Sequence, residues 1–496
     1  MRRRSRSEKA SEVPLPAPCA NRSTVALGVV RTTATQTATR TPGLFGPRLV
    51  TPLVASAVLN PINSTLIAVA LVPIAHSFGA RPEQTAWLIT SLYLATAVGQ
   101  PVVGLFVDRF GARRVLLTGA VIVMLAGIGG LMAFSLGWLI AVRAVLGVGT
   151  CAGFPAAMAV LRRTADAAGR GVPSRVLSVL AMSSQTVMVI GPTLGGALIG
   201  LFGWPAIFAV NIPLAGISLL LALFWVPKDD RANLSHERID VAGIVLFSAS
   251  LLVALLFVME PALDDLYLLG VAVVLAAVFV RTELRTGRPF VDLRMLAGNT
   301  PLLRTYLRQA LAFLIVYSIM FGYVQWLETA RDLSEEGAGV LLLPMSAVAV
   351  LAAAASGKPD GIYGRLITNS LALLAGSALL LFVGTGTWFV ALVGLAAVFG
   401  LGQGLTSVTN QTALYGQAPA DQMGTASGLF RTAQYLGAIG ASTLIALCFG
   451  AQTTSAGLHH LAWALVGIGV VLFAVTAFDR DLRATRSRQD LAKNAR

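Results

Sequence analysis

The chain has 496 residues, of which 56% are hydrophobic and only 12% are charged, and its mean hydropathy is +0.76. Soluble globular domains carry about 25% charged residues, so this composition excludes a soluble protein. The formal net charge of +14 would suit a nucleic-acid partner, but the placement of the basic residues along the chain argues against one.

The first 48 residues are polar and rich in Arg, Ser, Thr and Pro. They lack an apolar core long enough for a signal peptide, although such a tail can mimic a transit peptide. We expect residues 1–48 to be a disordered cytoplasmic tail, or a start assigned too far upstream.

From residue 49 onward, apolar runs of about twenty residues follow one another, which is the length of an α-helix that crosses a bilayer. We therefore expect an all-α polytopic membrane protein, because a β-barrel would show short alternating segments. Fourteen spans are predicted, at 49–75, 86–107, 115–135, 137–161, 176–202, 204–226, 241–260, 265–280, 305–326, 337–356, 367–384, 387–411, 426–449 and 460–478.

The first predicted helix contains the polar stretch LNPINSTLIAVALVP (59–73). Asn60, Asn63 and Ser64 share one helix face by their i, i+3, i+4 spacing, and Pro61 should bend the helix beside them. Because polar groups avoid lipid, we expect this face to line a cavity, and we predict these three residues as substrate-cavity residues.

The second and third predicted helices are joined by the charged loop GLFVDRFGARRVLL (104–117). Asp108 can cap the next helix and pair with basic groups such as Arg109 and Arg113, and Gly111 permits a tight turn. We expect these four residues to form a cytoplasmic gate. The alternative is an ordinary basic turn.

Three of the charged residues that fall within predicted helices are candidates for coupling. Arg143 would cost several kcal/mol in a membrane unless it is paired or hydrated, so it suggests function, although a snorkelling arginine is the alternative. Arg431 lies one turn from the cytoplasmic end and can also snorkel. Glu260 ends the seventh helix at the outer rim, where interfacial capping is the alternative.

The fifth predicted helix contains VIGPTLGGALIG (189–200). Pro192 removes a helical hydrogen bond and should kink the helix. Gly191, Gly195 and Gly196 allow neighbouring helices to approach closely, which is also common in ordinary helix packing.

The chain also resembles itself, because SVLAMSSQTVMVIG (178–191) and SGLFRTAQYLGAIG (427–440) match at an offset of 249. Gln185 and Gln434 occupy equivalent positions and either line a cavity or form interhelical hydrogen bonds. Gln325 is a weaker cavity candidate. Repeated helical halves are a common transporter plan, with the substrate site between them.

The repeat predicts two six-helix bundles, at 49–226 and 305–478, with a linker at 227–304 that holds two extra helices and a cytoplasmic tail at 479–496. With both termini inside, all but four of the 37 Lys and Arg residues lie on the cytoplasmic side or at its edge. The basic charge is therefore a topology signal rather than a nucleic-acid site.

The sequence lacks a phosphate-binding G-x-x-x-x-G-K-[ST] loop, a catalytic triad and a redox pair, and its three cysteines have no metal-ligand spacing. We expect no cofactor, no metal, no nucleotide partner and no enzymatic activity.

These motifs resemble those of the major facilitator superfamily. The pattern G-x-x-x-D-R-x-G-x-R at 104–113 is similar to its signature loop, RAVLGVGTCAGFP (143–155) to its fourth-helix arginine motif, and 189–200 to its antiporter motif. RIDVAGIVL (238–246) is similar to the start of the extra helix pair in the fourteen-spanner drug:proton antiporter branch. The resemblance implies export by alternating access, with Arg143 in proton coupling or cavity electrostatics.

Three positions depart from that branch. Asn63 stands where an acid is usual, Leu146 where a Gln is usual, and Asp360 lies one residue out of register in GKPDGIYGR (357–365). Asn63 cannot titrate, so proton coupling would need another group.

We predict a transporter of the bacterial cytoplasmic membrane, monomeric, that exports amphipathic or cationic small molecules in exchange for protons. One alternative is a dedicated metabolite exporter or a uniporter without proton coupling. A non-transporting scaffold or receptor is disfavoured, because the chain lacks a large soluble signalling domain.

Overall fold

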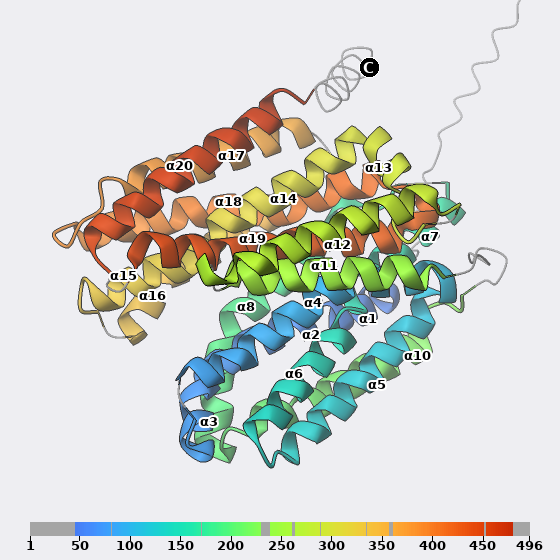
Figure 1. Ribbon diagram of the computed structural model, residues 1–496, viewed down its shortest axis with the longest axis horizontal. Helices are drawn as coiled ribbons and strands as arrows, with labels where there is room; N and C mark the ends of the chain where they lie inside the picture. Colours follow the sequence, from blue (N-terminus) through green and yellow to red (C-terminus); the bar gives the residue numbers. More distant parts are fainter. Residues whose placement is uncertain are drawn as a thin grey trace, which may run out of the picture. The chain divides into compact units, whose positions relative to one another are not determined.

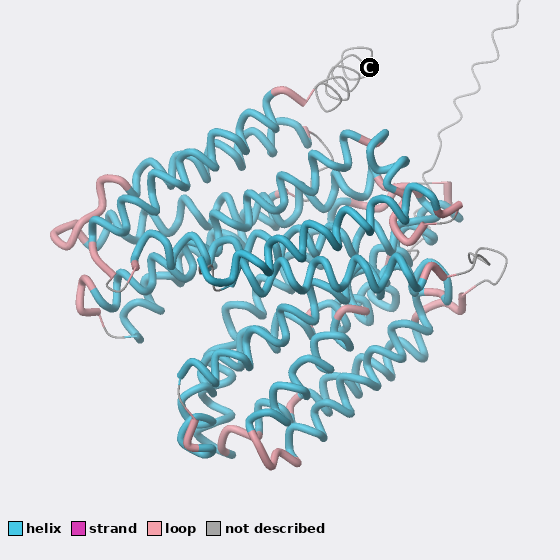
Figure 2. The backbone as a smooth tube through the Cα atoms, in the orientation of Figure 1, coloured by secondary structure: helices cyan, strands magenta, loops and turns pink. Residues whose placement is uncertain are grey.

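The computed structural model describes residues 45–80, 82–169, 171–229, 239–259, 263–287, 289–333, 335–356, 361–450 and 453–479, which belong to one compact unit, Gly43–Arg496. These residues form helices joined by loops (Figure 2). Of the tail expected at 1–48, residues 1–44 lie outside the described residues. Of the tail expected at 479–496, residues 480–496 lie outside them, and so does Glu260.

The helices before the linker are α1 (Pro47–Ala57), α2 (Leu59–Leu66), η1 (Ile67–Ala70), α3 (Leu71–Phe78), α4 (Pro82–Phe110), α5 (Ala112–Leu131), α6 (Leu136–Thr150), α7 (Gly153–Ala167), α8 (Ser174–Phe202), α9 (Ala206–Ala209) and α10 (Asn211–Trp225). The helices after residue 239 begin with α11 (Val241–Met259), η3 (Leu263–Asp265), α12 (Leu266–Arg285) and α13 (Leu293–Gly298).

The last part of the described chain contains α14 (Thr300–Ser318), η4 (Ile319–Tyr323), α15 (Val324–Thr329), α16 (Glu335–Ala355), α17 (Ile362–Leu380), α18 (Phe389–Gln417), η5 (Ala420–Gln422), α19 (Met423–Phe449) and α20 (Ser455–Ala477). Here η4 is a single π-helical turn inside the longer helix that α14 begins, a feature often found at functional sites.

Within the described residues, eleven helical segments are long and apolar enough to cross a membrane, which fits a multi-pass membrane protein. The count of fourteen is not confirmed. Three of the predicted spans are helical, in α8, α16 and α17, but are not among these eleven segments.

The first predicted span is not one continuous helix. α1 ends at Ala57 and α2 begins at Leu59, and a 3-10 turn separates α2 from α3. Pro61 has no backbone N–H to donate to the carbonyl of Ala57, four residues earlier, which explains the interruption at Val58. α8, by contrast, runs as one helix through residue 192.

The helices α1–α10 pack mainly against one another, as in the pairs α4 with α6 and α5 with α10, and α14–α20 do the same, as in α16 with α18 and α17 with α20 (Figure 1). The two groups meet where α4 packs on α19, α8 on α16 and α7 on α19. A buried apolar cluster crosses this boundary and includes Met158, Leu177, Leu414 and Phe430.

The helices α11 and α12 pack against each other, and α11 contacts both α4 and α19. Leu255 of α11 is buried with Ala97 of α4 and Ile439 of α19, and the Thr443 hydroxyl donates a hydrogen bond to the carbonyl of Val258. α11 therefore lies along the seam between α4 and α19.

Candidate functional site

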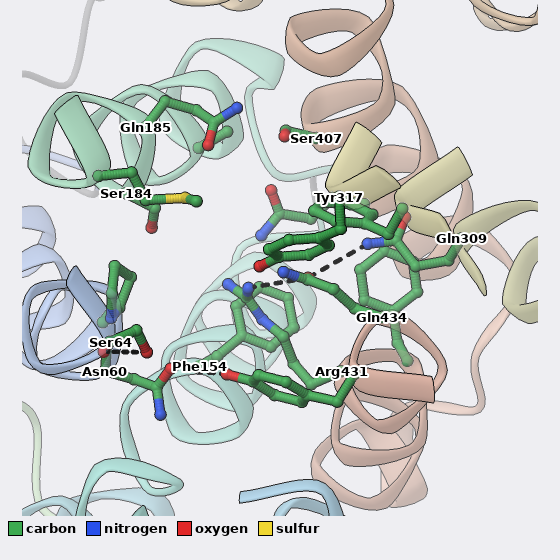
Figure 3. A pocket seen from close by; sticks show the side chains of 18 of the residues that line it. Asn60, Ser64, Phe154, Ser184, Gln185, Gln309, Tyr317, Ser407, Arg431 and Gln434 are labelled. Atoms are coloured by element: carbon green, nitrogen blue, oxygen red, sulfur yellow. Dashed lines mark hydrogen bonds between the residues drawn. The ribbon is translucent and has the colours of Figure 1, made fainter. Parts of the chain in front are cut away.

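A cavity of about 160 Å³ lies between the two helix groups. Its wall comes from both groups: α1, α2, α4, α7 and α8 on one side, and α14, η4, α18 and α19 on the other. Seven aromatic side chains line it, namely Tyr93, Phe154, Phe313, Tyr317, Phe321, Phe430 and Tyr435. Hydroxyl and amide groups complete the wall (Figure 3).

Arg431 projects into this cavity from α19 (Figure 3). One terminal nitrogen of its guanidinium donates a hydrogen bond of 3.1 Å to Oε1 of Gln434, and its central carbon lies 4.0 Å from the ring centre of Phe154. The Nε atom is buried and has no hydrogen-bond partner among the described residues. The side chain therefore faces the cavity rather than snorkelling to the membrane edge.

Asn60 and Ser64 line the cavity, as their shared helix face predicts. The side-chain amide nitrogen of Asn60 donates to the Thr150 hydroxyl over 2.9 Å, and the Tyr435 hydroxyl donates to Oδ1 of Asn60 over 2.6 Å. The second bond joins α2 to α19 across the boundary between the two helix groups.

Asn63 does not line the cavity, so its assignment to the cavity wall was wrong. Its side chain is buried, with 1% exposed, and its amide donates to Oδ1 of Asn211 in α10 over 2.6 Å. Asn60 and Ser64 differ by about 40° around the helix axis, whereas Asn63 lies about 60° to the other side of Asn60. That rotation turns its side chain toward α10.

Arg143 is buried, with 2% exposed, and does not snorkel. Its Nε donates to the carbonyl of Leu88 over 2.9 Å and one terminal nitrogen to the carbonyl of Asn63 over 3.1 Å. Asn63 lies in the last turn of α2, where carbonyls lack helical partners. Arg143 therefore ties α6 to α2 and α4, just behind the cavity wall.

Gln185 and Gln434 both line the cavity, from α8 and α19. Gln434 also accepts a hydrogen bond from the Gln309 amide over 3.4 Å, so both interpretations of this residue hold in part. Gln325 is not among the lining residues. Sequence reasoning missed Gln309, Tyr317 and Tyr435, because isolated polar or aromatic residues in apolar helices give no signal of the direction they face.

Asp108 caps a helix, but not the one expected. Its Oδ1 accepts from the Gly424 amide over 2.8 Å, and its Oδ2 accepts from the Thr425 amide over 2.8 Å and the Thr425 hydroxyl over 2.9 Å. These donors are in the first turn of α19, in the other helix group. A carboxylate is favourable there, since helix N-termini are electropositive.

Close backbone contact accompanies this cap. A Cβ atom on Gly104 of α4 would overlap the backbone of Gly424, and one on Gly428 would overlap the backbone of Gln100. The glycines bring α4 and α19 together at the Asp108 end, which we call the α4–α19 contact.

The cap of α5 comes from Asp229, which sequence reasoning did not single out. Its carboxylate accepts from the amides of Arg113 and Arg114 over 3.4 and 3.3 Å, and it pairs with Arg163 at 3.3 Å. Gly111 has φ +97°, and a Cβ there would overlap this carboxylate.

The basic residues of the loop do not bind Asp108, contrary to the expected pairing. The Arg113 side chain donates to the carbonyl of Leu223, and Arg109 lies 5.8 Å from the centre of the Phe110 ring.

The glycines of the fifth predicted span differ in their surroundings. A Cβ on Gly191 would overlap the Thr65 side chain, and one on Gly195 would meet Val69 and Leu66, whereas Gly196 faces open space. The first two let α8 approach α2 and η1, but Gly196 makes no such contact. Pro192 lies within α8.

The comparisons with known proteins agree with one another. The Major Facilitator Superfamily model matches residues 53–442. The chain is 32% identical over 416 residues to the MFS-type transporter YwoD of Bacillus subtilis (strain 168), which covers 82% of this chain and 91% of that protein. It is 30% identical over 452 residues to the lincomycin resistance protein of Streptomyces lincolnensis, covering 87% and 92%.

Among solved structures, the human organic anion transporter MFSD10 has a TM-score of 0.66 at 16% identity and covers 86% of this chain and 99% of its own. At that identity the likeness shows the fold alone. The family model, the relatives and the fold lead to one conclusion: this multi-pass membrane protein belongs to the major facilitator superfamily of transporters.

Proposed function

We propose that the chain exports amphipathic small molecules across a bacterial cytoplasmic membrane by alternating access. Residues 49–226 and 305–478 would move against each other as two units, with 227–304 as a connecting linker and both termini in the cytoplasm. The observation that carries this proposal is the aromatic and amide-lined cavity, to which both helix groups contribute. Such walls suit ligands with an apolar body and a few polar groups.

The α4–α19 contact would be the cytoplasmic gate. Arg109, Arg113, Arg114 and Arg163 gather at this end, and basic loops face the cytoplasm. Opening the gate requires the three hydrogen bonds of Asp108 to break and the glycine-lined helices to separate. The direction of transport is supported by the likeness to a lincomycin resistance protein and by the resemblance of 189–200 to an antiporter motif.

We propose that protons drive export and that Asp108 responds to them. A protonated carboxyl keeps its shape but loses its attraction to the electropositive end of α19, which would weaken the gate. Arg143 and Arg431 remain candidates for coupling as charges within predicted helices, Arg143 also through the resemblance, and Glu260 through its place at a predicted helix end.

A second candidate is a dedicated exporter of one metabolite, or a uniporter that does not use protons. It is favoured by one observation: no carboxylate lines the cavity among the described residues. Proteoliposomes with and without an imposed pH gradient separate the two candidates, because only a proton-coupled exporter accumulates its substrate against a gradient in response to protons.

The test of export uses a bacterial host that lacks its own major exporters. Cells that produce the full chain should tolerate at least one toxic amphipathic compound better than cells with an empty plasmid, and an uncoupler should remove the difference. Equal tolerance and equal dye efflux across a broad panel would contradict export of amphipathic molecules.

A further inference from the structure

The cavity wall has an uneven charge. Among the described lining residues, Arg431 is the one group that is ionised at neutral pH, and the others are neutral amides, hydroxyls, phenols and apolar side chains. Any molecule that enters the cavity therefore meets a positive charge and no carboxylate.

We propose that the cavity selects molecules in which an anionic group is attached to an aromatic body, and that Arg431 binds the anion. This inference rests on the proposed function and names its substrate class. It replaces the expectation of cationic substrates.

No carboxylate among the described residues pairs with Arg431. Its guanidinium contacts the neutral amide of Gln434 and the face of Phe154, and its Nε has no hydrogen-bond partner within the described part of the chain. Burying a guanidinium without a counter-ion costs free energy. A bound anion that accepts two hydrogen bonds from the guanidinium would offset this cost.

The surroundings of Arg431 strengthen this preference. Arg143 is close enough to Tyr93 for an electrostatic interaction, and it donates hydrogen bonds to the backbone carbonyls of Leu88 and Asn63. Both cations raise the potential of the cavity, where the dielectric constant is low and charge effects are larger than in water.

The aromatic wall would hold the body of the molecule rather than a cation. Aromatic faces can attract cations, but the face of Phe154 is already covered by Arg431 at 4.0 Å. Its neighbour Phe430 stacks on Phe154 with ring centres 6.1 Å apart. A flat ring system could extend this stack while its anionic group meets the guanidinium.

Two dyes with the same three-ring xanthene body test the inference, because fluorescein is an anion at pH 7.5 and rhodamine 123 is a cation. Binding of each dye to the purified full chain is measured by fluorescence anisotropy. The wild type should bind fluorescein at least about tenfold more tightly than rhodamine 123, which is about 1.4 kcal/mol. Arg431→Gln should lower fluorescein affinity about tenfold and leave that of rhodamine 123 equal or higher.

Three further variants make the result specific. Gln434→Glu keeps Arg431 but places a carboxylate where Oε1 already lies 3.1 Å from the guanidinium, so it should also remove the preference for fluorescein. Arg431→Lys should retain part of it. Arg175→Gln removes the same charge from an exposed position on α8 and should change neither affinity.

The inference is wrong if rhodamine 123 binds as tightly as fluorescein, if neither dye binds, or if Arg431→Gln lowers both affinities equally. The proposed export fails on a different observation, namely the absence of transport of any compound in cells or vesicles. A preference for fluorescein without transport would overturn the function and keep the anion site.

Discussion

Asp108 accepts three hydrogen bonds from the first turn of α19 and is the residue that most directly holds the two helix groups together at one end. Hydrogen bonds to a charged acceptor contribute about 1.5–3 kcal/mol each at most, and the helix N-terminus adds to them. Because the carboxylate is buried, with 8% exposed, water can replace little of this interaction while the contact is closed.

Asp108→Asn should shift the protein toward a conformation in which this end is open. The amide removes the negative charge and turns one acceptor into a donor that faces other donors, which should weaken the contact by about 2–3 kcal/mol. Spin labels at the exposed positions Phe110 and Asp421, measured by double electron–electron resonance, should show a larger population at long distance.

The control is Asp166→Asn, which removes a charge from an exposed i,i+4 pair with Arg162 at 3.0 Å. It should leave the distance distribution unchanged. An identical distribution in wild type and Asp108→Asn would show that the cap does not hold the contact closed.

Arg143→Ala should destabilise the first helix group. The variant leaves the carbonyls of Leu88 and Asn63 without the arginine donor and opens a void, a loss of about 2–4 kcal/mol. The midpoint of thermal unfolding of the detergent-purified protein should fall, whereas the exposed control Arg175→Ala should keep it. An unchanged midpoint for Arg143→Ala would contradict a structural role for these bonds.

Side-chain direction explains which site residues the sequence could predict. Asn60, Ser64, Gln185 and Gln434 line the cavity as expected, because polar groups in apolar helices avoid lipid. Asn63 also avoids lipid, but it does so by binding Asn211 of α10. The i, i+3 spacing places Asn63 within about 60° of Asn60, and this is too coarse to tell a side chain that lines the cavity from one that faces a neighbouring helix.

At the scale of helices, length and hydropathy were enough to locate nearly every helical segment. They were not enough to predict which helix each capping side chain binds. The donors to Asp108 lie 316 and 317 residues further along the chain, so local sequence favoured a cap on the next helix. Asp229, which caps α5, is more than a hundred residues from the amides it binds.

Two glycines of α8 should respond differently to the same substitution. Gly191→Ala places a methyl group against Thr65 and should destabilise the fold by about 1–3 kcal/mol through overpacking. Gly196→Ala meets nothing within 4 Å and should be neutral. Thermal unfolding of the two purified variants measures the difference in stability. Equal unfolding midpoints would show that the contact between α8 and α2 accommodates a methyl group at residue 191.

At the scale of the whole chain, the two helix groups are joined by hydrogen bonds such as those of Asp108 and Tyr435, and they share the cavity. The contacts α4 with α19 and α8 with α16 flank it, and α11 lies along the first of these seams. The proposed alternating access would require one of these contacts to open while the other closes.

Transport into inside-out membrane vesicles tests export most directly, because the cytoplasmic face is then accessible from the medium. Vesicles from an exporter-deficient host that produces the full chain should accumulate fluorescein faster than vesicles without it, and an uncoupler should abolish the difference. Equal accumulation of fluorescein and of a broad panel of other dyes in both kinds of vesicle would contradict the account.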